Sequence, residues 1–168
     1  MKPPDPIFAS FLEQQVREAT AMADLNPSLM RVEFVAPGGF LLHLSCRGLV
    51  KRPGGEVEEA SAFVVGLRLP ANYLREAPNP VSIACVLGPH FCFHPNIHAA
   101  SGQICLGHLR AACPVTDLVI QVVEILTWVN FATHDVLSPE AGQWARNNLG
   151  RFPLERRPIH LPPVLAAS

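Results

Sequence analysis

The segment FCFHPNIHAASGQICLGHLRAAC, residues 91 to 113, holds three of the chain's five cysteines and three of its seven histidines. From Gly88 to Val115 neither helical nor strand periodicity is sustained, although the residues are mostly apolar and uncharged. A loop of this length in a compact domain is usually functional or disordered, and its low charge argues against disorder. The sequence therefore predicts that the functional site lies in this segment.

Four runs of residues upstream of this segment are typical of β-strands. They are rich in β-branched and aromatic residues, and stretches that contain proline or glycine separate them. Because the connections between consecutive runs are short, an antiparallel meander is favoured over parallel pairing. The predicted strands are Met30–Ala36, Phe40–Cys46, Ser61–Leu69 and Val81–Leu87.

Helical periodicity occurs on both sides of these strands. Residues 7–23 carry apolar side chains along one side, which predicts an amphipathic first helix that ends before Pro27. Downstream, Thr116 or Asp117 could cap a long apolar helix that continues to about Phe131. We expect this central helix to pack on the sheet.

A shorter helix is predicted near the end of the chain. Ser138 is a favourable N-cap, Pro139 suits the first helical position, and the pattern stops at Gly150. The sequence thus predicts an α+β fold with an N-terminal helix, a four-stranded antiparallel meander, a long loop, a central helix and a short C-terminal helix. Residues 1–150 are expected to form one domain, and residues 151–168 a proline-rich extended tail.

Composition limits the function classes that fit the chain. With 168 residues, 49% apolar and 16% charged, it can bury a single core without metal or disulfides. A net charge of -1 argues against a nucleic-acid groove, which would carry clustered lysine and arginine. The sequence shows no signal peptide and no run of apolar residues of membrane-spanning length, so we expect a cytoplasmic protein that binds neither membrane nor nucleic acid.

Zinc binding is one interpretation of the clustered cysteines and histidines. Structural zinc ligands usually come as closely spaced pairs such as C-x-x-C, and the segment has no carboxylate to support such a site. A zinc-stabilised interaction domain is therefore a weaker alternative, and we predict neither a metal nor another cofactor. The potential ligands are Cys92, His94, His98, Cys105, His108 and Cys113.

Nucleophilic catalysis is a second interpretation of the segment. Cys105 could pair with any of the histidines as a Cys–His hydrolase, but a protease would also need a third, orienting group. The local sequence signatures of the common cysteine proteases are missing as well. The hydrolase is therefore a weaker interpretation than the next one.

The order of the residues favours a third interpretation. The segment HPNI (94–97) is followed by ICL (104–106), after a four-strand meander and before a long helix. This arrangement resembles the active-site stretch of ubiquitin-conjugating enzymes, which carry a ubiquitin-like modifier as a thioester on the UBC fold. The segments LPANYLREAPNPV (69–81) and HDVLSPEA (134–141) are similar to further parts of that family, so the resemblance covers about residues 7–148.

The resemblance implies a role for five residues. It makes Cys105 the thioester acceptor and Asn96 the residue that stabilises the oxyanion or holds the loop. One side-chain donor to an oxyanion can contribute about 3 kcal/mol. It further implies that Asp135 guides the incoming lysine, and that His94 and Pro95 position the loop. The implied partners are an activating enzyme, a ubiquitin-like modifier and a target protein, and the need for a ligase stays open.

The sequence also departs from the family pattern at several positions. Cys105 follows Asn96 by nine positions, one more than is usual in the family, and Ala112 and Cys113 replace the usual tryptophan and serine. In these departures the chain resembles divergent bacterial members of ubiquitin-like conjugation operons, some of which act in anti-phage defence. A UBC-like adaptor without catalytic activity is the alternative from a different functional class.

Overall fold

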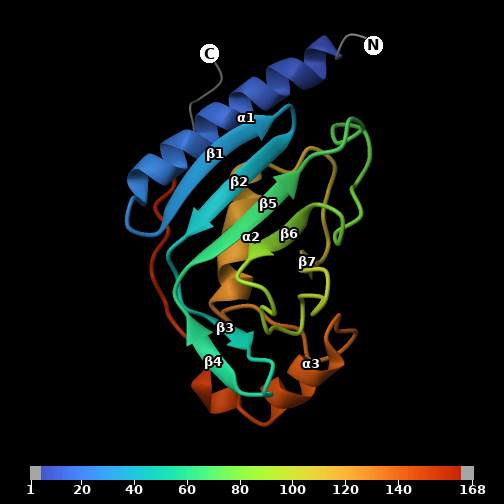
Figure 1. Cartoon of the computed structure of the whole chain (residues 1–168). Coiled ribbons are helices and arrows are strands. Elements are labelled where there is room, and N and C mark those ends of the chain that lie inside the picture. Colours follow the sequence, from blue (N-terminus) through green and yellow to red (C-terminus); the bar gives the residue numbers. More distant parts are fainter. Residues whose placement is uncertain (1–4, 164–168) are drawn as a thin grey trace.

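A five-stranded antiparallel sheet with a helix packed behind it forms the centre of the molecule (Figure 1). The computed structural model describes residues 5–163. The strand order is β1-β2-β5-β6-β7, so the predicted four-strand meander and the α+β class are confirmed, and one short strand is added at the edge. The strands are β1 (Met30–Ala36), β2 (Gly39–Leu44), β5 (Phe63–Arg68), β6 (Ala84–Gly88) and β7 (Gln103–Ile104).

The alternation of buried residues turns one face of the sheet toward the core. β2 pairs with β5 from Gly39 with Arg68 to Leu44 with Phe63. The buried members of this pair are apolar and project to the same side, toward the helix behind the sheet. They are Phe40, Leu42, Leu44, Phe63, Val65 and Leu67.

A second, two-stranded sheet was missed in the prediction. It consists of β3 (Gly48–Lys51) and β4 (Val57–Ala60), which the sequence analysis treated as a connection. These strands are too short to show a period, and β3 is completed by distant residues: Lys51 N–H donates to the Phe91 carbonyl at 2.9 Å, and Phe93 N–H to the Leu49 carbonyl at 2.7 Å. The hairpin thus holds the beginning of the predicted functional segment.

The first helix, α1, spans Pro6–Leu25 and begins at the N-cap Asp5, whose side chain accepts a hydrogen bond from the Ile7 N–H at 3.0 Å. It is slightly longer than predicted at both ends. Its buried face includes Gln15, whose side-chain oxygen accepts the Val115 N–H at 2.8 Å. This bond joins α1 to the start of the central helix.

The central helix, α2, spans Val115–Leu126 and packs on the sheet as expected. Its predicted limits were wrong at both ends. Pro114 is the N-cap, so neither Thr116 nor Asp117 caps the helix, and α1 supplies the first acceptor instead. The helix ends at Leu126 rather than near Phe131 because Trp128 takes a left-handed backbone conformation, with φ of 60°.

The last helix, α3, spans Pro139–Arg146 and begins at Ser138 as predicted, with the Ser138 hydroxyl accepting the Ala141 N–H at 3.4 Å. It ends at Arg146 and not at Gly150, because the chain tightens into the 3₁₀ helix η1 (Leu149–Arg151). Between α3 and the β3–β4 hairpin, buried aromatic residues form a second core cluster around Trp128.

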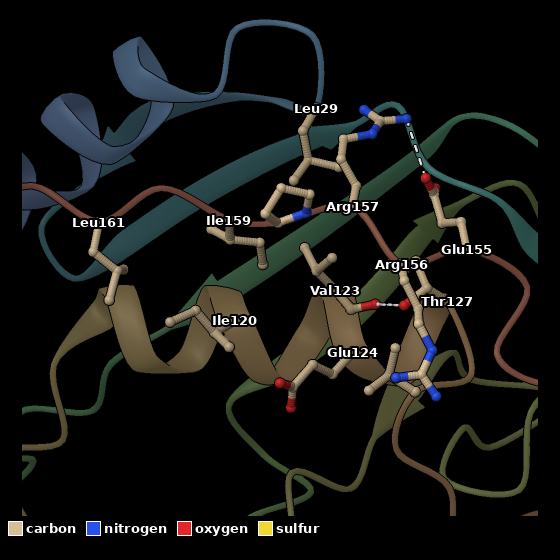
Figure 2. Close-up of a pocket in the computed structure, with 12 residues that line it drawn as sticks. Leu29, Ile120, Val123, Glu124, Thr127, Glu155, Arg156, Arg157, Ile159 and Leu161 are labelled. Carbon is tan, nitrogen blue, oxygen red and sulfur yellow. Dashed lines mark hydrogen bonds and ion pairs between the residues drawn. The ribbon is translucent and has the colours of Figure 1, made fainter.

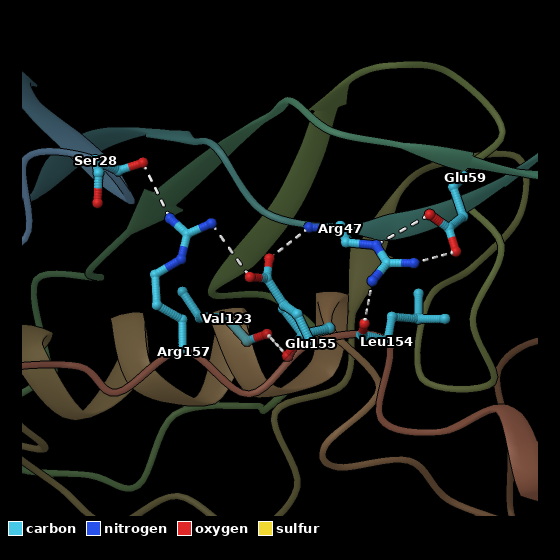
Figure 3. A network of polar contacts seen from close by, with 8 residues as sticks. Ser28, Arg47, Glu59, Val123, Leu154, Glu155 and Arg157 are labelled. Carbon is cyan, nitrogen blue, oxygen red and sulfur yellow. Dashed lines mark hydrogen bonds and ion pairs between the residues drawn. The ribbon is translucent and has the colours of Figure 1, made fainter.

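Residues 152–163, here called the C-terminal strap, contain no helix or strand and run back along α2 toward the α1–β1 connection (Figure 1). The strap is hydrogen-bonded at several points. Leu154 N–H donates to the Thr127 carbonyl at 2.9 Å, and His160 N–H to the Asn26 side-chain oxygen at 2.8 Å. Glu155 accepts the Arg47 N–H at 2.6 Å (Figure 3). We therefore expect the strap to contribute to folding.

A groove of about 480 Å³ lies between the strap and α2 (Figure 2). Its floor is mostly apolar, with Ile120 and Val123 from α2 opposite Ile159 and Leu161 from the strap.

No helix within residues 5–163 combines the length and the hydropathy that a membrane span requires.

Candidate functional site

The predicted functional segment forms a short hairpin at the edge of the sheet. Ile97 pairs with Ile104, His98 N–H donates to the Gln103 carbonyl at 2.9 Å, and the tip is closed by a bond of the same length from Gly102 N–H to the His98 carbonyl. Gly102 has φ of 75°, and a β-carbon there would lie 2.4 Å from the Val86 carbonyl oxygen. Both ends of the hairpin are paired. The extra residue in the nine-position spacing between Asn96 and Cys105 is therefore accommodated at the exposed tip.

Cys105 lies directly after β7, on a half-buried, irregular stretch of chain. Its N–H donates to the Asn96 carbonyl at 2.8 Å, and the Asn96 side-chain amide donates to the Cys105 carbonyl at 3.4 Å. This pair of bonds fixes the backbone of the cysteine against Asn96. The structure thus brings together two residues that the sequence predicted to share a site.

Burial affects the thiols of the four remaining cysteines. Burial raises the pKa of Cys46 and Cys92 to about 12. Burial also raises the pKa of the Cys85 and Cys113 thiols. Burial thus disfavours the thiolate form of these four cysteines, and since the thiolate is the nucleophile, they are poor candidates for the acceptor.

Asn96 joins the cysteine to the segment that precedes α3. Its side-chain oxygen accepts the Ala132 N–H at 2.9 Å, while its amide nitrogen faces the Cys105 carbonyl. The amide is therefore oriented by main-chain groups on both sides. Such fixed orientation is what a preorganised hydrogen-bond donor requires.

His94 is buried, with 1% of its surface exposed, and its Nδ1 accepts the Asn96 N–H at 3.0 Å. The proton of the neutral ring is therefore on Nε2, for which no partner is found within residues 5–163. Burial lowers the pKa of His94 to about 3. A ring that stays neutral and buried positions the loop and cannot serve as a base at the cysteine.

Burial of a neutral His94 predicts a pH-dependent stability. The unfolded chain binds a proton below the usual histidine pKa of about 6.5, whereas the folded chain binds it only near 3. The free energy of unfolding is therefore unaffected by His94 above pH 6.5 and falls as the pH drops toward 3. At pH 5 protonation of this group in the unfolded chain lowers it by about 2 kcal/mol. Urea unfolding of wild type and His94→Gln at pH 7.5 and 5 measures this loss.

The matched control for that experiment is His98→Gln, since His98 is exposed in the hairpin tip. We expect wild type and His98→Gln to lose the same stability between the two pH values, and His94→Gln to lose about 2 kcal/mol less. Equal losses in all three proteins would contradict a buried neutral His94.

Main-chain hydrogen bonds join Pro95 to the segment that contains Asp135. The buried Pro95 carbonyl accepts the Leu137 N–H at 2.9 Å and the Ser138 N–H at 3.2 Å. Together with the bond from Ala132 to Asn96, this anchors the Asp135 segment to the HPN residues on both sides. Asp135 itself is exposed, with φ of 52°, and within residues 5–163 its side chain makes no hydrogen bond to Cys105 or Asn96.

Tyr73 is a supporting residue to which the sequence analysis gave no role of its own. It is fully buried, its hydroxyl donates to the Cys113 carbonyl at 2.7 Å, and its carbonyl accepts the Ala112 N–H at 2.9 Å. On the same side, Leu106 N–H donates to the Pro80 carbonyl at 3.3 Å. The upstream proline-tyrosine segment thus holds the chain that follows Cys105, at the positions where Ala112 and Cys113 depart from the family pattern.

Trp128 is another supporting residue that sequence reasoning missed. Its ring centre lies 4.5 Å from that of His94 and 4.2 Å from that of Phe152, which stacks on it at 10°. In the sequence Trp128 reads as one more apolar residue of the central helix, so no local signal marks its contact with the site.

The six potential zinc ligands do not converge. Cys92 and Cys113 lie in the apolar core, His94 lies among aromatic rings, and His98 is exposed at the hairpin tip. Among residues 5–163 no three histidine, cysteine, aspartate or glutamate side chains are placed to hold a metal ion. The arrangement therefore gives no support to the zinc-stabilised alternative.

Comparison with known proteins identifies the fold. No protein-family model and no curated protein matches the sequence. Among solved structures, the E2 domain of a ubiquitin conjugating enzyme from Toxoplasma gondii is similar, with a TM-score of 0.52 and 18% identity over 83% of this chain and 92% of that chain. At this identity the likeness concerns the fold alone, and it confirms the predicted UBC-like α+β architecture.

Proposed function

We propose that the protein is a conjugating enzyme that accepts the C-terminus of a ubiquitin-like modifier as a thioester on Cys105 and transfers it to an amine of a target protein. The observation that supports this proposal is the pair of hydrogen bonds between Asn96 and Cys105 at the edge of a UBC-like fold. The Cys105 N–H donates to the Asn96 carbonyl at 2.8 Å, and the Asn96 side-chain amide donates to the Cys105 carbonyl at 3.4 Å. It supports the roles that the HPN and ICL motifs imply for these two residues.

The proposed reaction has two balanced steps. In the first, the Cys105 thiolate attacks the carbonyl carbon that links the modifier to a cysteine of an activating enzyme, and the thiolate of that enzyme leaves. In the second, a target amine attacks the same carbon, loses a proton and forms an amide, and the Cys105 thiolate leaves. Neither step changes an oxidation state.

The chain's own residues support the second step. The tetrahedral intermediate carries an oxyanion, for which the Asn96 amide, with its oxygen held by Ala132, is the proposed donor. The Asp135 carboxylate, exposed on a segment anchored to Pro95 and Asn96, is proposed to guide the incoming amine. His94 and Pro95 hold the loop in place.

The test is a charging reaction followed by intact mass analysis. The protein is mixed with ATP, a ubiquitin-like activating enzyme and its modifier. We expect wild type and Cys85→Ala to gain the mass of one modifier less one water, and Cys105→Ala to gain none. Cys85 is the matched control because it is the other half-buried cysteine. An equal adduct on Cys105→Ala would refute the proposal.

We further propose a cytoplasmic, bacterial setting in a ubiquitin-like conjugation system, with anti-phage defence as its role. The bacterial setting and the defence role rest on the sequence departures alone, among them the nine-position spacing between Asn96 and Cys105. Deletion of the gene from a phage-resistant host tests it. Resistance that depends on Cys105 supports the role, and unchanged resistance contradicts it.

A non-catalytic adaptor is the second candidate function. It is favoured by the engagement of both ends of the Asn96 side chain with main-chain groups, which a purely structural asparagine would also show. In the charging reaction an adaptor would bind the modifier or the activating enzyme and form no covalent adduct.

A further inference from the structure

An aromatic stack connects the C-terminal strap to the HPN residues. The Phe152 ring lies flat on Trp128, with centres 4.2 Å apart and planes within 10°. Trp128 also contacts His94: the two ring centres are 4.5 Å apart, and the ring planes meet at 61°. Phe131 and Trp144 complete the cluster at 5.5 and 5.8 Å. The site residues therefore lie against a packed aromatic group supplied partly by the strap.

The strap holds Phe152 in place through hydrogen bonds made by the residues that follow it. Leu154 N–H donates to the carbonyl of Thr127, the residue before Trp128. Beyond it, Glu155 accepts the Arg47 N–H, and Arg157 donates to the Ser28 carbonyl at 3.0 Å (Figure 3). Because these bonds reach the β2–β3 and α1–β1 connections, the position of Phe152 is fixed by the body of the fold.

The path continues from His94 to the reactive cysteine by hydrogen bonds. The His94 ring accepts the Asn96 N–H, and the Asn96 carbonyl accepts the Cys105 N–H. A ring that shifts on Trp128 must lengthen or bend the first bond, since Nδ1 is fixed in the ring plane. The position of the Asn96 backbone therefore depends on how His94 packs.

The cluster also carries an energetic cost that packing alone does not explain. Trp128 Nε1 is buried without a hydrogen-bond partner within residues 5–163, and His94 Nε2 has none of normal geometry, although the Asn130 main chain lies close enough to oppose the lowering of the ring's pKa by burial. Each unpaired buried donor costs about 1–3 kcal/mol. Phenylalanine and leucine would fill such a core without this cost.

We propose that Phe152, carried by the C-terminal strap, is a positioning residue for the transfer reaction: it sets the place of Trp128 and His94 and thereby orients Asn96 beside Cys105. The inference rests on the proposed function for its catalytic part. Its structural part is that Phe152 controls the environment of Cys105, and this part can be tested in the absence of a modifier.

The experiment measures two rates in full-length variants. The first is the rate at which a preformed thioester discharges to free lysine in a single turnover. The second is the rate at which iodoacetamide alkylates Cys105, followed by peptide mass. The variants are Phe152→Ala, Phe152→Leu and the conservative Phe152→Tyr. The matched control is Leu12→Ala, which opens a cavity in the other core cluster, far along the chain from the stack.

We expect discharge by Phe152→Ala to be about tenfold slower, because misplaced groups lose catalytic power steeply. Alkylation of Cys105 should be several-fold faster in the same variant, because the loop opens more often. Both rates should be close to the wild-type values in Phe152→Tyr, which keeps the aromatic ring, and in Leu12→Ala. Phe152→Leu, which keeps the apolar volume, should be slow in discharge even if Phe152→Ala proves poorly folded.

The outcomes separate the two proposals. If wild type forms no thioester, the proposed function fails, and alkylation alone then decides whether Phe152 positions the loop. If wild type is charged but the Phe152 variants discharge and alkylate like Leu12→Ala, the positioning role is refuted while the proposed function stands.

Discussion

Replacement of Asn96 by aspartate is expected to slow discharge of the Cys105 thioester to free lysine by about 100-fold, while charging changes little. Aspartate keeps the side-chain oxygen that accepts the Ala132 N–H at 2.9 Å, so the segment before α3 stays anchored. It removes the amide donor, which faces the Cys105 carbonyl and which we propose stabilises the oxyanion. Single-turnover discharge, with the amount of thioester measured at the start, gives the rate.

Asn96→Ala is the comparison that separates catalysis from structure. Alanine loses both the donor and the bond to Ala132, whereas aspartate loses only the bond to the Cys105 carbonyl, so a purely structural Asn96 predicts a smaller defect in Asn96→Asp than in Asn96→Ala. The oxyanion role predicts that both variants are slow. Discharge by Asn96→Asp within threefold of wild type would rule out the role of the amide as donor.

Truncation after Gly150 is expected to lower the free energy of unfolding by about 4 kcal/mol or more. It removes Leu154, which is buried, and Phe152, which covers Trp128, and loss of one such side chain usually costs about 2–5 kcal/mol. It also leaves the Thr127 carbonyl without its partner. Since domains are stable by only about 5–15 kcal/mol, the truncated chain should lose a large part of its stability.

Urea unfolding followed by circular dichroism measures this effect, with Leu161→Ala as the control because Leu161 is 56% exposed. We expect that control to stay within about 0.5 kcal/mol of wild type. The truncation also tests the domain boundary that the sequence predicts at residue 150. A fully stable 1–150 fragment would support that boundary and contradict a structural role for the strap.

Elements with a strong local signal could be predicted from the sequence. β1 has the predicted limits of Met30 and Ala36, and α3 begins at the predicted cap, Ser138. The pairing of Asn96 with Cys105 also agrees with the motif, because a hairpin closed by Gly102 brings the two together. In these cases the residues that determine the structure are near one another in the chain.

Features that depend on distant partners could not be predicted. β3 is recognisable only beside Phe91 and Phe93, which bond to its main chain from a later segment. The end of α2 is set at Trp128, whose left-handed backbone is held in a cluster with Trp144 and Phe152. The strap has no period at all, and its place follows from separate bonds to Asn26, Arg47 and Thr127.

In the proposed reaction the side chain at position 105 forms the covalent bond to the modifier, and the chemistry of that bond can be compared in wild type and Cys105→Ser. A thioester is cleaved by excess dithiothreitol, whereas an ester to serine resists it. We predict a thiol-sensitive adduct on wild type and a thiol-resistant adduct of the corresponding mass, mapped to residue 105, on Cys105→Ser. A thiol-sensitive adduct on Cys105→Ser would contradict the claim, because the modifier would then be carried by another cysteine.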